Sequence, residues 1–156
     1  MEIETRFARL EDFDFVHTGR KEVFDIENVD GSYVYNEEFE RNKIEEAIKS
    51  NRVLVAASKE RLVGFIWFVL SSKCSFGVDY DDHSNVYAFI DFVFVSNEFR
   101  SCGVGRKLYT QMEIWCKENN IKEIVLDVME CNPKSMLFHE ALGYKPFVRL
   151  YSKKIE

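Results

Sequence analysis

The chain has 156 residues, of which 46% are hydrophobic and 15% aromatic, and its formal net charge is −6. These values are typical of a single globular domain over residues 1–156 and exclude a disordered chain. The acidic balance argues against nucleic-acid binding, which needs a basic surface, and no apolar run approaches the roughly 18 residues of a membrane span. The start of the chain does not resemble a signal peptide, so we expect a cytoplasmic protein.

The first part of the chain predicts one strand and two helices. Alternation of apolar and polar residues predicts a strand over 3–9, and acidic residues then open a helix from Leu10 to about Asp25. A second helix is expected over 35–49, with Asn36 or Tyr35 near its cap. Its expected buried stripe consists of Phe39, Ile44, Ala47 and Ile48.

A hairpin and a polar loop follow. The runs 52–58 and 61–71, separated by Lys59-Glu60, have the spacing of a β-hairpin. The loop from Ser71 to Asn85 contains three aspartates but lacks the spacing and closing Glu of an EF-hand, so no metal site is predicted. We expect this loop to border the active site. The four cysteines lie far apart without a Cys-x-x-Cys motif, which indicates free thiols rather than a metal or redox site.

The central feature is a strand that passes into a helix. Phe89 to Val95 is an apolar, β-rich run that predicts a buried strand, and a helix is expected from Gly103 to about Asn119. Two glycines at the start of this helix permit a close backbone approach to a ligand. Free amide groups and the helix dipole attract anions there, and Arg100, Arg106 and Lys107 add full positive charge. We therefore expect a phosphate-bearing ligand at this turn.

Three known ligand patterns compete with a plain surface turn for this segment. A Walker A loop fails because Gly105 is followed by Arg106, Lys107 and Leu108 rather than by Lys and Ser or Thr. A Rossmann fingerprint fails because Leu108 stands where its third glycine belongs. The third pattern is Arg/Gln-x-x-Gly-x-Gly/Ala, which the segment Arg100 to Gly105 matches fully.

The end of the chain predicts a strand, a helix and a terminal strand. Lys122 to Met129 is the first strand, and Asn132 and Pro133 then cap and open a helix that Gly143 ends. Val148 to Lys153 is the expected terminal strand. The element order is β, α, α, β, β, β, α, β, α, β, which predicts an α/β (α+β) fold with a mixed sheet and helices on both faces.

Two segments resemble the signatures of the GNAT superfamily of N-acetyltransferases. The pattern from Arg100 to Gly105 is that of its pyrophosphate loop. The segment from Asn132 to Tyr144 resembles its second signature, which has an Asn, a small residue three positions on, an apolar-Tyr pair and Gly-Phe. The matching positions here are Asn132, Ser135, Phe138-His139 and Gly143-Tyr144. The resemblance covers 87–151 well and the first half only through element order.

The resemblance implies the acyl-CoA N-acyltransferase fold with a splayed central sheet, and acetyl-CoA as co-substrate without a metal. Pantetheine would lie in the gap like an added strand. The resemblance assigns the backbone contacts of pantetheine to Val93, Phe94 and Val95. It assigns the pyrophosphate to Arg100, Ser101, Cys102, Gly103, Val104, Gly105 and Arg106. It assigns the thioester end to Asn132 and Phe138.

Asp91 is the first candidate for a catalytic base. An ammonium cannot attack a thioester, so a base or a water chain must first remove a proton. Asp91 interrupts an apolar strand, where an unpaired charge is costly to bury, and alternation places it on the face of Val93 and Val95. The corresponding region of diamine acetyltransferases carries an acidic residue. The alternative is a structural carboxylate satisfied by the backbone or by an arginine.

His139 is the candidate acid for the departing thiolate. It stands where many members of the family carry a tyrosine, and a histidine can give a proton near neutral pH. The alternative is an exposed helix histidine, with Tyr109 or Tyr144 as the substitute acid.

The residues that select the acceptor carry no motif. In GNAT-like folds the helical stretch before the hairpin commonly borders the acceptor site, so Tyr33, Tyr35 and Glu38 are candidate substrate contacts. A second group of carboxylates could attract a cationic acceptor, namely Glu37, Glu38, Asp79, Asp81 and Asp82.

The leading hypothesis is an acetyltransferase that moves an acetyl group from acetyl-CoA to a primary amine of a small molecule or a protein, by direct attack on the thioester. The alternatives are a catalytically inactive GNAT-fold module that binds acyl-CoA for regulation, and a nucleotide-binding signalling domain. Neither nucleic-acid nor membrane partners are expected, and a homodimer is common in such folds.

Overall fold

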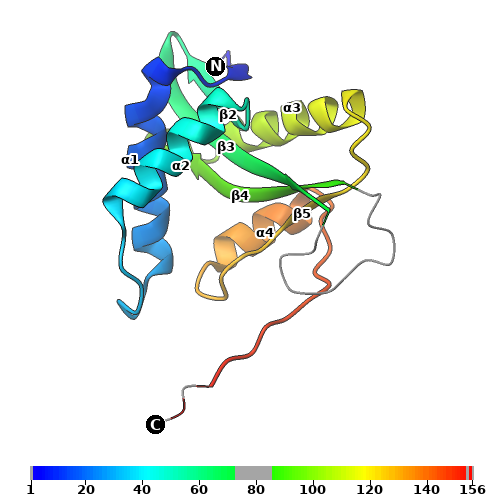
Figure 1. Ribbon diagram of the computed structural model, residues 1–156. Coiled ribbons are helices and arrows are strands. Elements are labelled where there is room, and N and C mark those ends of the chain that lie inside the picture. The colour runs from blue at the N-terminus through cyan, green and yellow to red at the C-terminus, as the bar shows by residue number, and fades with distance from the viewer. Residues whose placement is uncertain (1, 73–85, 154, 156) are drawn as a thin grey trace.

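The protein is built around one five-stranded sheet (Figure 1). A computed structural model describes residues 2–72, 86–153 and 155. The strands lie in chain order across the sheet; the first four run antiparallel to their neighbours, and the last two are parallel to each other. Their bounds are β1 Glu4–Phe7, β2 Val53–Ser58, β3 Arg61–Ser71, β4 Tyr87–Val95 and β5 Ile124–Leu126. The mixed sheet predicted from the sequence is thus confirmed.

Helices cover both faces of this sheet, as predicted. The first pair, α1 Phe13–Glu27 and α2 Glu37–Lys49, lies on one face, and α3 Val104–Glu118 and α4 Pro133–Ala141 lie on the other. Two short 3-10 turns, Leu10–Asp12 and Asn97–Phe99, precede α1 and α3. No helix in the described part of the chain has the length and apolar character that a membrane span requires.

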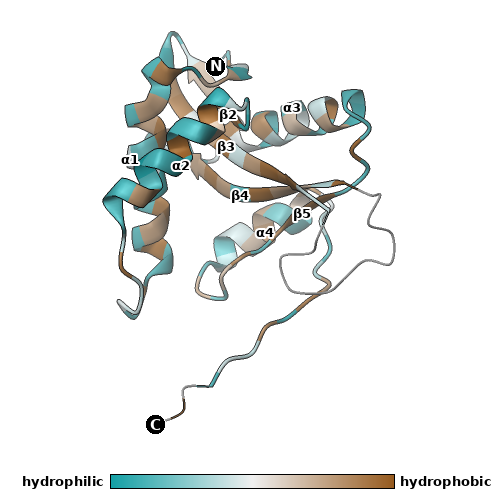
Figure 2. Ribbon diagram, in the orientation of Figure 1, coloured by the Kyte–Doolittle hydropathy of each residue, from teal (hydrophilic) through white to brown (hydrophobic). Residues whose placement is uncertain are grey.

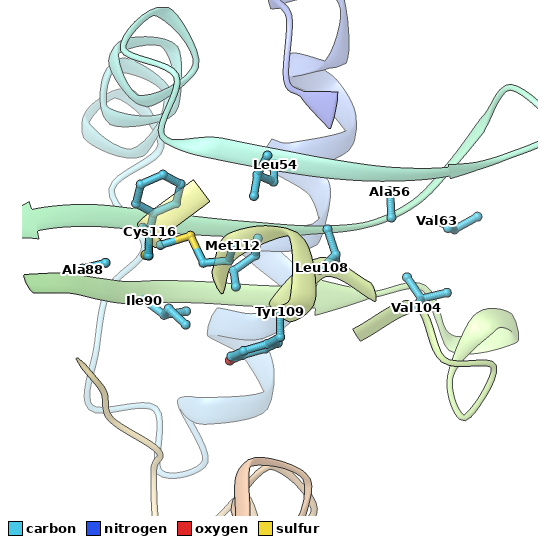
Figure 3. Close-up of a cluster of buried hydrophobic side chains, with 12 residues drawn as sticks. Leu54, Ala56, Val63, Ala88, Ile90, Val104, Leu108, Tyr109, Met112 and Cys116 are labelled. Atoms are coloured by element: carbon cyan, nitrogen blue, oxygen red, sulfur yellow. The ribbon is translucent and has the colours of Figure 1, made fainter. Parts of the chain in front are cut away.

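The apolar face of α3 forms the larger core. Val104, Leu108, Met112 and Cys116 recur at helical spacing and are buried against the strands, as Figure 3 shows. Their spacing of four residues places them on one face of a helix with 3.6 residues per turn. The packing fixes the start of α3 firmly against the end of β4.

The α2 stripe is confirmed only in part. Ile44, Ala47 and Ile48 are buried against the sheet, but Phe39 is 56% exposed. At 3.6 residues per turn, five positions rotate a side chain by roughly 500°, so Phe39 lies roughly 140° away from Ile44 around the helix. Phe39 therefore faces away from the core. Asn36 caps the helix as predicted, because its side chain accepts the Phe39 N–H at 3.0 Å.

The predicted hairpin between β2 and β3 is confirmed. Lys59 and Glu60 form its two-residue turn with φ of 50° and 67°. This pair of positive φ values suits the right-handed twist of the flanking strands.

The sequence overestimates the strands at the end of the chain. The run predicted as a strand over Lys122–Met129 is paired only at Ile124–Leu126, and the strand expected over Val148–Lys153 does not form. This segment extends away from the sheet in Figures 1 and 2, and Leu150 and Tyr151 are 69% and 86% exposed. The residues have β propensity, but propensity does not make a strand without a partner to pair with.

Candidate active site

The sheet opens between its two parallel strands. Ala88 to Ile90 pair with Ile124 to Leu126, and there β5 ends. β4 continues for five more residues, Asp91 to Val95, whose described strand partners all lie on β3. The other edge of this stretch therefore offers backbone groups to an extended ligand, which can add itself as a strand. It includes the backbone of Val93 and the Val95 carbonyl, which accepts from Arg100 Nε at 3.0 Å. The Phe94 carbonyl lies on the β3 side instead, 2.7 Å from the position of a Cβ on Gly64.

At the end of β4 the chain makes a sharp turn into α3. We call the segment Arg100–Gly105 the anion turn. Ser101 and Gly103 have φ of 59° and 84°, and Gly103 is the N-cap of α3. A Cβ on Gly103 would meet nothing within 4 Å, so glycine favours the left-handed conformation here rather than relieving a close contact. The exposed turn thus presents the first free N–H groups of a fifteen-residue helix.

Gly105 brings the second signature next to the first. A Cβ at Gly105 would lie 2.9 Å from Cζ of Phe138, so only glycine lets α4 approach α3 this closely. Asn132 caps α4 by accepting the Ser135 N–H at 3.2 Å, with Pro133 at the first helical position. Both expectations for this helix are met, and Phe138 lies beside the anion turn. Of the predicted cofactor-binding set, the exposed members are Arg100, Ser101, Cys102, Gly103 and Arg106, and Val104 is buried in the core.

Asp91 lies at a β-bulge. Trp67 pairs with Phe92 and Phe68 pairs with Ile90, so Asp91 is the extra residue on β4. The bulge changes the alternation, which makes the expected shared face with Val93 and Val95 wrong. Those two valines pack on the α3 side, whereas the charges that act on Asp91 include Lys43, Arg20 and Glu40 on α1 and α2.

The environment of Asp91 favours its protonated form. Burial raises the pKa of the Asp91 carboxyl, Lys43 opposes this rise, and Asp127 adds to it. A carboxyl with a raised pKa is a stronger base once it is ionised. The side chain is half-buried at the place where β4 and β5 separate. It forms no ion pair with any described residue.

His139 lies in the core rather than on the surface. It is 8% exposed, and its Nδ1 lies 2.7 Å from the Ser135 carbonyl oxygen. A carbonyl can only accept, so Nδ1 carries the hydrogen and Nε2 of the neutral ring accepts from the Tyr109 hydroxyl. Burial lowers the pKa of His139, and the bond to Ser135 opposes this only partly. Both ring nitrogens are therefore engaged within the protein.

The three predicted acceptor contacts have different surroundings. Tyr33 is 61% exposed, and Glu38 is exposed on the first turn of α2. Tyr35 is half-buried, with its ring 5.1 Å from that of Phe24 and its hydroxyl without a hydrogen-bond partner among the described residues. Of the three, only Tyr35 has its ring close to the guanidinium of Arg20, whose other contacts are described next.

Further charged residues near Asp91 were missed by the sequence prediction. The guanidinium of Arg20 lies 3.8 Å from the centre of the Phe92 ring and forms an ion pair with Glu40, Nε to Oε2, at 3.2 Å. Burial raises the pKa of the Glu27 carboxyl at the end of α1, and the charge of Asp127, the residue after β5, adds to this rise. Asp127 interrupts an apolar run just as Asp91 does, so the same signal could have identified it.

Three acidic candidates, Asp79, Asp81 and Asp82, lie at 73–85, outside the described residues. Within the described ranges, no group of three or more His, Cys, Asp or Glu side chains is placed to hold a metal ion.

Comparison with curated proteins finds a relative for part of the chain. It is 37% identical over 68 residues to aminoglycoside N(6')-acetyltransferase type 1 from Acinetobacter baumannii. The match covers 43% of this chain and about half, 47%, of that relative.

Solved structures of similar fold cover the whole chain. The aminoglycoside acetyltransferase AAC(6')-Iy, in complex with a CoA-linked bisubstrate analogue, has a TM-score of 0.77 at 18% identity and covers 100% of this chain and 99% of its own. AAC(6')-Ih from A. baumannii has a TM-score of 0.76 at 18% identity, with 99% of both chains covered. The family model described as "Acetyltransferase (GNAT) family" matches residues 20–144. This match spans most of the chain and includes both signatures, and the chain belongs to the GNAT acetyltransferase family.

Proposed function

We propose that the protein is an N-acetyltransferase that moves the acetyl group of acetyl-CoA to a primary amine of a small molecule. The observation that carries the proposal is the open edge of β4, which runs directly into the anion turn and has the Asp91 carboxyl at its bulge. This edge and turn fit an extended chain that ends in a pyrophosphate. The named activities of the relatives make aminoglycosides the first acceptors to test.

The proposed cofactor contacts divide between backbone and side chains. The open edge at Val93 and Val95 would bind pantetheine, with Arg100 released from the Val95 carbonyl; Phe94, the third residue expected for this role, directs its carbonyl toward β3. The amides of the anion turn would bind the pyrophosphate, assisted by the exposed Arg106. Asn132 and Phe138 are proposed near the reacting end. Acetyl-CoA supplies the activated acetyl group as a thioester.

Asp91 is the proposed base. Its carboxylate would accept a proton from the acceptor ammonium, and the neutral nitrogen would then attack the thioester carbon. The C–S bond breaks as the amide forms, and the nitrogen loses a second proton while the thiolate gains one. Tyr33, Tyr35 and Glu38 remain proposed acceptor contacts, with Tyr35 supported by its buried hydroxyl, which has no hydrogen-bond partner among the described residues.

His139 is the proposed source of the thiolate's proton, under one condition that the geometry sets. Since both ring nitrogens are engaged, the bond to Tyr109 or to Ser135 must open before His139 can exchange a proton with a ligand. Tyr109 itself is a poor acid, because burial raises its pKa well above the ordinary tyrosine value.

Two measurements test this function. Calorimetry with CoA, ATP and NAD should show binding of CoA alone, and thiol release from acetyl-CoA should appear with at least one member of a panel of amines. Binding of CoA without thiol release for any amine would favour the inactive regulatory module instead. Binding of ATP or NAD without CoA would overturn both.

A further inference from the structure

Arg20 is a buried arginine that contacts two other elements. It lies on α1, is 8% exposed, and has its guanidinium 3.8 Å from the centre of the Phe92 ring on β4. From α2, which covers the same face of the sheet (Figure 1), Glu40 accepts from Nη2 at 3.3 Å and places Oε2 3.2 Å from Nε. A guanidinium is planar, so a ring against its face and a carboxylate along its edge together fix its orientation. Arg20 therefore links α1, α2 and β4 at one point.

The preceding residue, Gly19, allows α1 to lie close enough to the sheet for this contact. A Cβ on Gly19 would lie 2.6 Å from Cδ1 of Phe94 and 2.7 Å from Cε1 of Phe65. Both distances are too short for carbon atoms, so α1 can take this position only because residue 19 has no side chain. Packing that does not depend on the charge of Arg20 thus holds its backbone against β4.

Phe92 is the residue directly after Asp91 at the β-bulge. Phe92 pairs with Trp67 on β3, whereas Asp91 has no residue opposite it on that strand. The Phe92 ring packs against the core on the α1 and α2 face, 5.3 Å from the ring of Trp67. The ladder leaves the extra residue of a bulge unpaired, so the direction of its side chain depends on how its neighbours are held. The contact of Arg20 with Phe92 restrains the chain one residue away from Asp91.

The shape of the Arg20 side chain matters here more than its charge. Burial raises the pKa of Asp91, and Lys43 opposes this rise more strongly than Arg20 does. A lysine at position 20 would supply the same charge, but it lacks the plane that covers a ring and the fork that matches a carboxylate. Substitution by lysine therefore separates the two contributions.

We propose that Arg20 is a positioning residue for Asp91: its guanidinium holds the Phe92 ring, and with it the bulge, in the conformation that directs the Asp91 carboxyl to the acceptor. This inference rests on the proposed function for the role of Asp91 as base. Arg20 itself exchanges no proton with the acceptor. Its replacement should lower kcat through Asp91 and leave CoA binding at the anion turn unchanged.

The test is a double-mutant cycle of Arg20→Lys and Asp91→Asn, with kcat measured by thiol release from acetyl-CoA in the presence of neamine. Misplacing a reacting group by about 1 Å can cost about 10²-fold in rate, so Arg20→Lys should lower kcat by about 10-fold or more. In the Asp91→Asn background the same substitution should change kcat by less than about twofold, because the base that Arg20 positions is absent. CoA affinity, measured by calorimetry, should stay within about twofold of the wild type in all variants.

Arg6→Lys is the matched control. Arg6 on β1 also holds a carboxylate with its fork, since Nη1 and Nη2 donate to Asp12 at 2.6 Å and 2.9 Å. In the sheet, β1 is separated from β4 by β2 and β3. Both lysine variants should lower the midpoint of thermal unfolding, but only Arg20→Lys should lower kcat. An arginine that merely stabilises the fold would lower the midpoint and leave kcat unchanged.

A second measurement does not depend on turnover. Hydrogen exchange of the backbone amides at 90–93 should be faster in Arg20→Lys than in Arg6→Lys, because the bulge is less restrained. The inference is overturned if exchange at 90–93 is equal in the two variants, if Arg6→Lys lowers kcat as much as Arg20→Lys, or if Arg20→Lys costs the same factor with and without Asp91. If no amine gives thiol release with the wild type, the proposed function fails, and the exchange rates still decide whether Arg20 holds the bulge.

Discussion

The two sides of the open edge depend on different structural features, one on backbone conformation and the other on charged side chains. The proposed cofactor side, formed by β4 and the anion turn, relies on backbone conformation, with Ser101 and Gly103 at positive φ and Gly105 in contact with Phe138. The proposed acceptor side relies on side chains from separate elements, among them Asp91 on β4, Arg20 on α1 and Lys43 on α2. Local backbone geometry requires particular residues at fixed spacing, whereas a cluster of charges can be assembled from any positions that the fold brings together. The two sides should therefore respond differently to substitution.

Asp91→Asn should have the largest effect and should affect only the acceptor side. Removal of a general base costs typically 10²–10⁴-fold in rate, so we expect kcat to fall by about 10²-fold or more. CoA affinity, measured by calorimetry, should stay within about twofold because the anion turn is unchanged. Asp14→Asn, an exposed carboxylate on α1, is the control. A structural role for Asp91 would instead lower thermal stability and leave kcat nearly intact.

The cofactor side can be tested by adding one methyl group. Gly105→Ala would place a Cβ 2.9 Å from Phe138 Cζ, and such overpacking costs about 1–3 kcal/mol. Alanine in a helix returns only about 1 kcal/mol relative to glycine. We therefore expect net destabilisation in urea unfolding, together with weaker CoA binding as α4 moves from the anion turn.

Introducing Gly105→Ala into the Phe138→Leu variant tests whether contact with the Phe138 ring causes the destabilisation. In Phe138→Leu the obstructing ring is absent, so Gly105→Ala should become neutral or stabilising there. An additive double mutant would mean that Gly105 is needed for a reason other than contact with Phe138.

This contrast explains how much the sequence alone could predict. The anion turn, the α3 core face and the Asn132 cap follow from local patterns, and the structure contains them. The direction of Asp91 could not be predicted, because the bulge depends on how β4 pairs with β3, a strand from elsewhere in the chain. Arg20 and Glu27 were missed for the same reason, since only tertiary packing brings α1 to the end of β5. The expected strand over 148–153 failed because β propensity does not supply a partner.

Lys43 should affect Asp91 by its charge alone. It is the strongest favourable charge acting on that carboxyl and holds its pKa below the value that burial alone would set. Lys43→Gln should therefore raise the pKa of Asp91 and move the acid limb of the kcat/KM profile to higher pH. The loss should be a few-fold on the acid side and smaller at alkaline pH. Lys43→Arg keeps the charge and should restore the wild-type limb; a profile unchanged in Lys43→Gln would contradict the assignment of Asp91 as base.

The smallest expected effect concerns His139, and it is a change in the folding stability of the protein rather than in its catalytic rate. Because burial lowers the pKa of His139, the unfolded state binds its proton at a higher pH than the folded state does. The stability that the neutral ring contributes is therefore complete above about pH 6.5, the ordinary histidine value, and is lost as pH falls through the folded pKa. Raised pKa values at Glu27, Asp91 and Asp127 act in the opposite direction, so only the difference between two proteins isolates the histidine.

The variant His139→Phe is compared with the wild type by urea unfolding between pH 5 and 8. The variant leaves the Tyr109 hydroxyl without its acceptor and should lose about 1–3 kcal/mol at neutral pH. This loss should shrink as pH falls below about 6.5, by at most about 1.4 kcal/mol per pH unit, since the wild type alone carries the buried ring. Curves that stay parallel over the whole range would mean that the pKa of His139 is the same in the folded and unfolded protein. A loss that grows as pH falls would mean that the folded protein raises this pKa, and the ring would then carry the proton that the proposed acid needs near neutral pH.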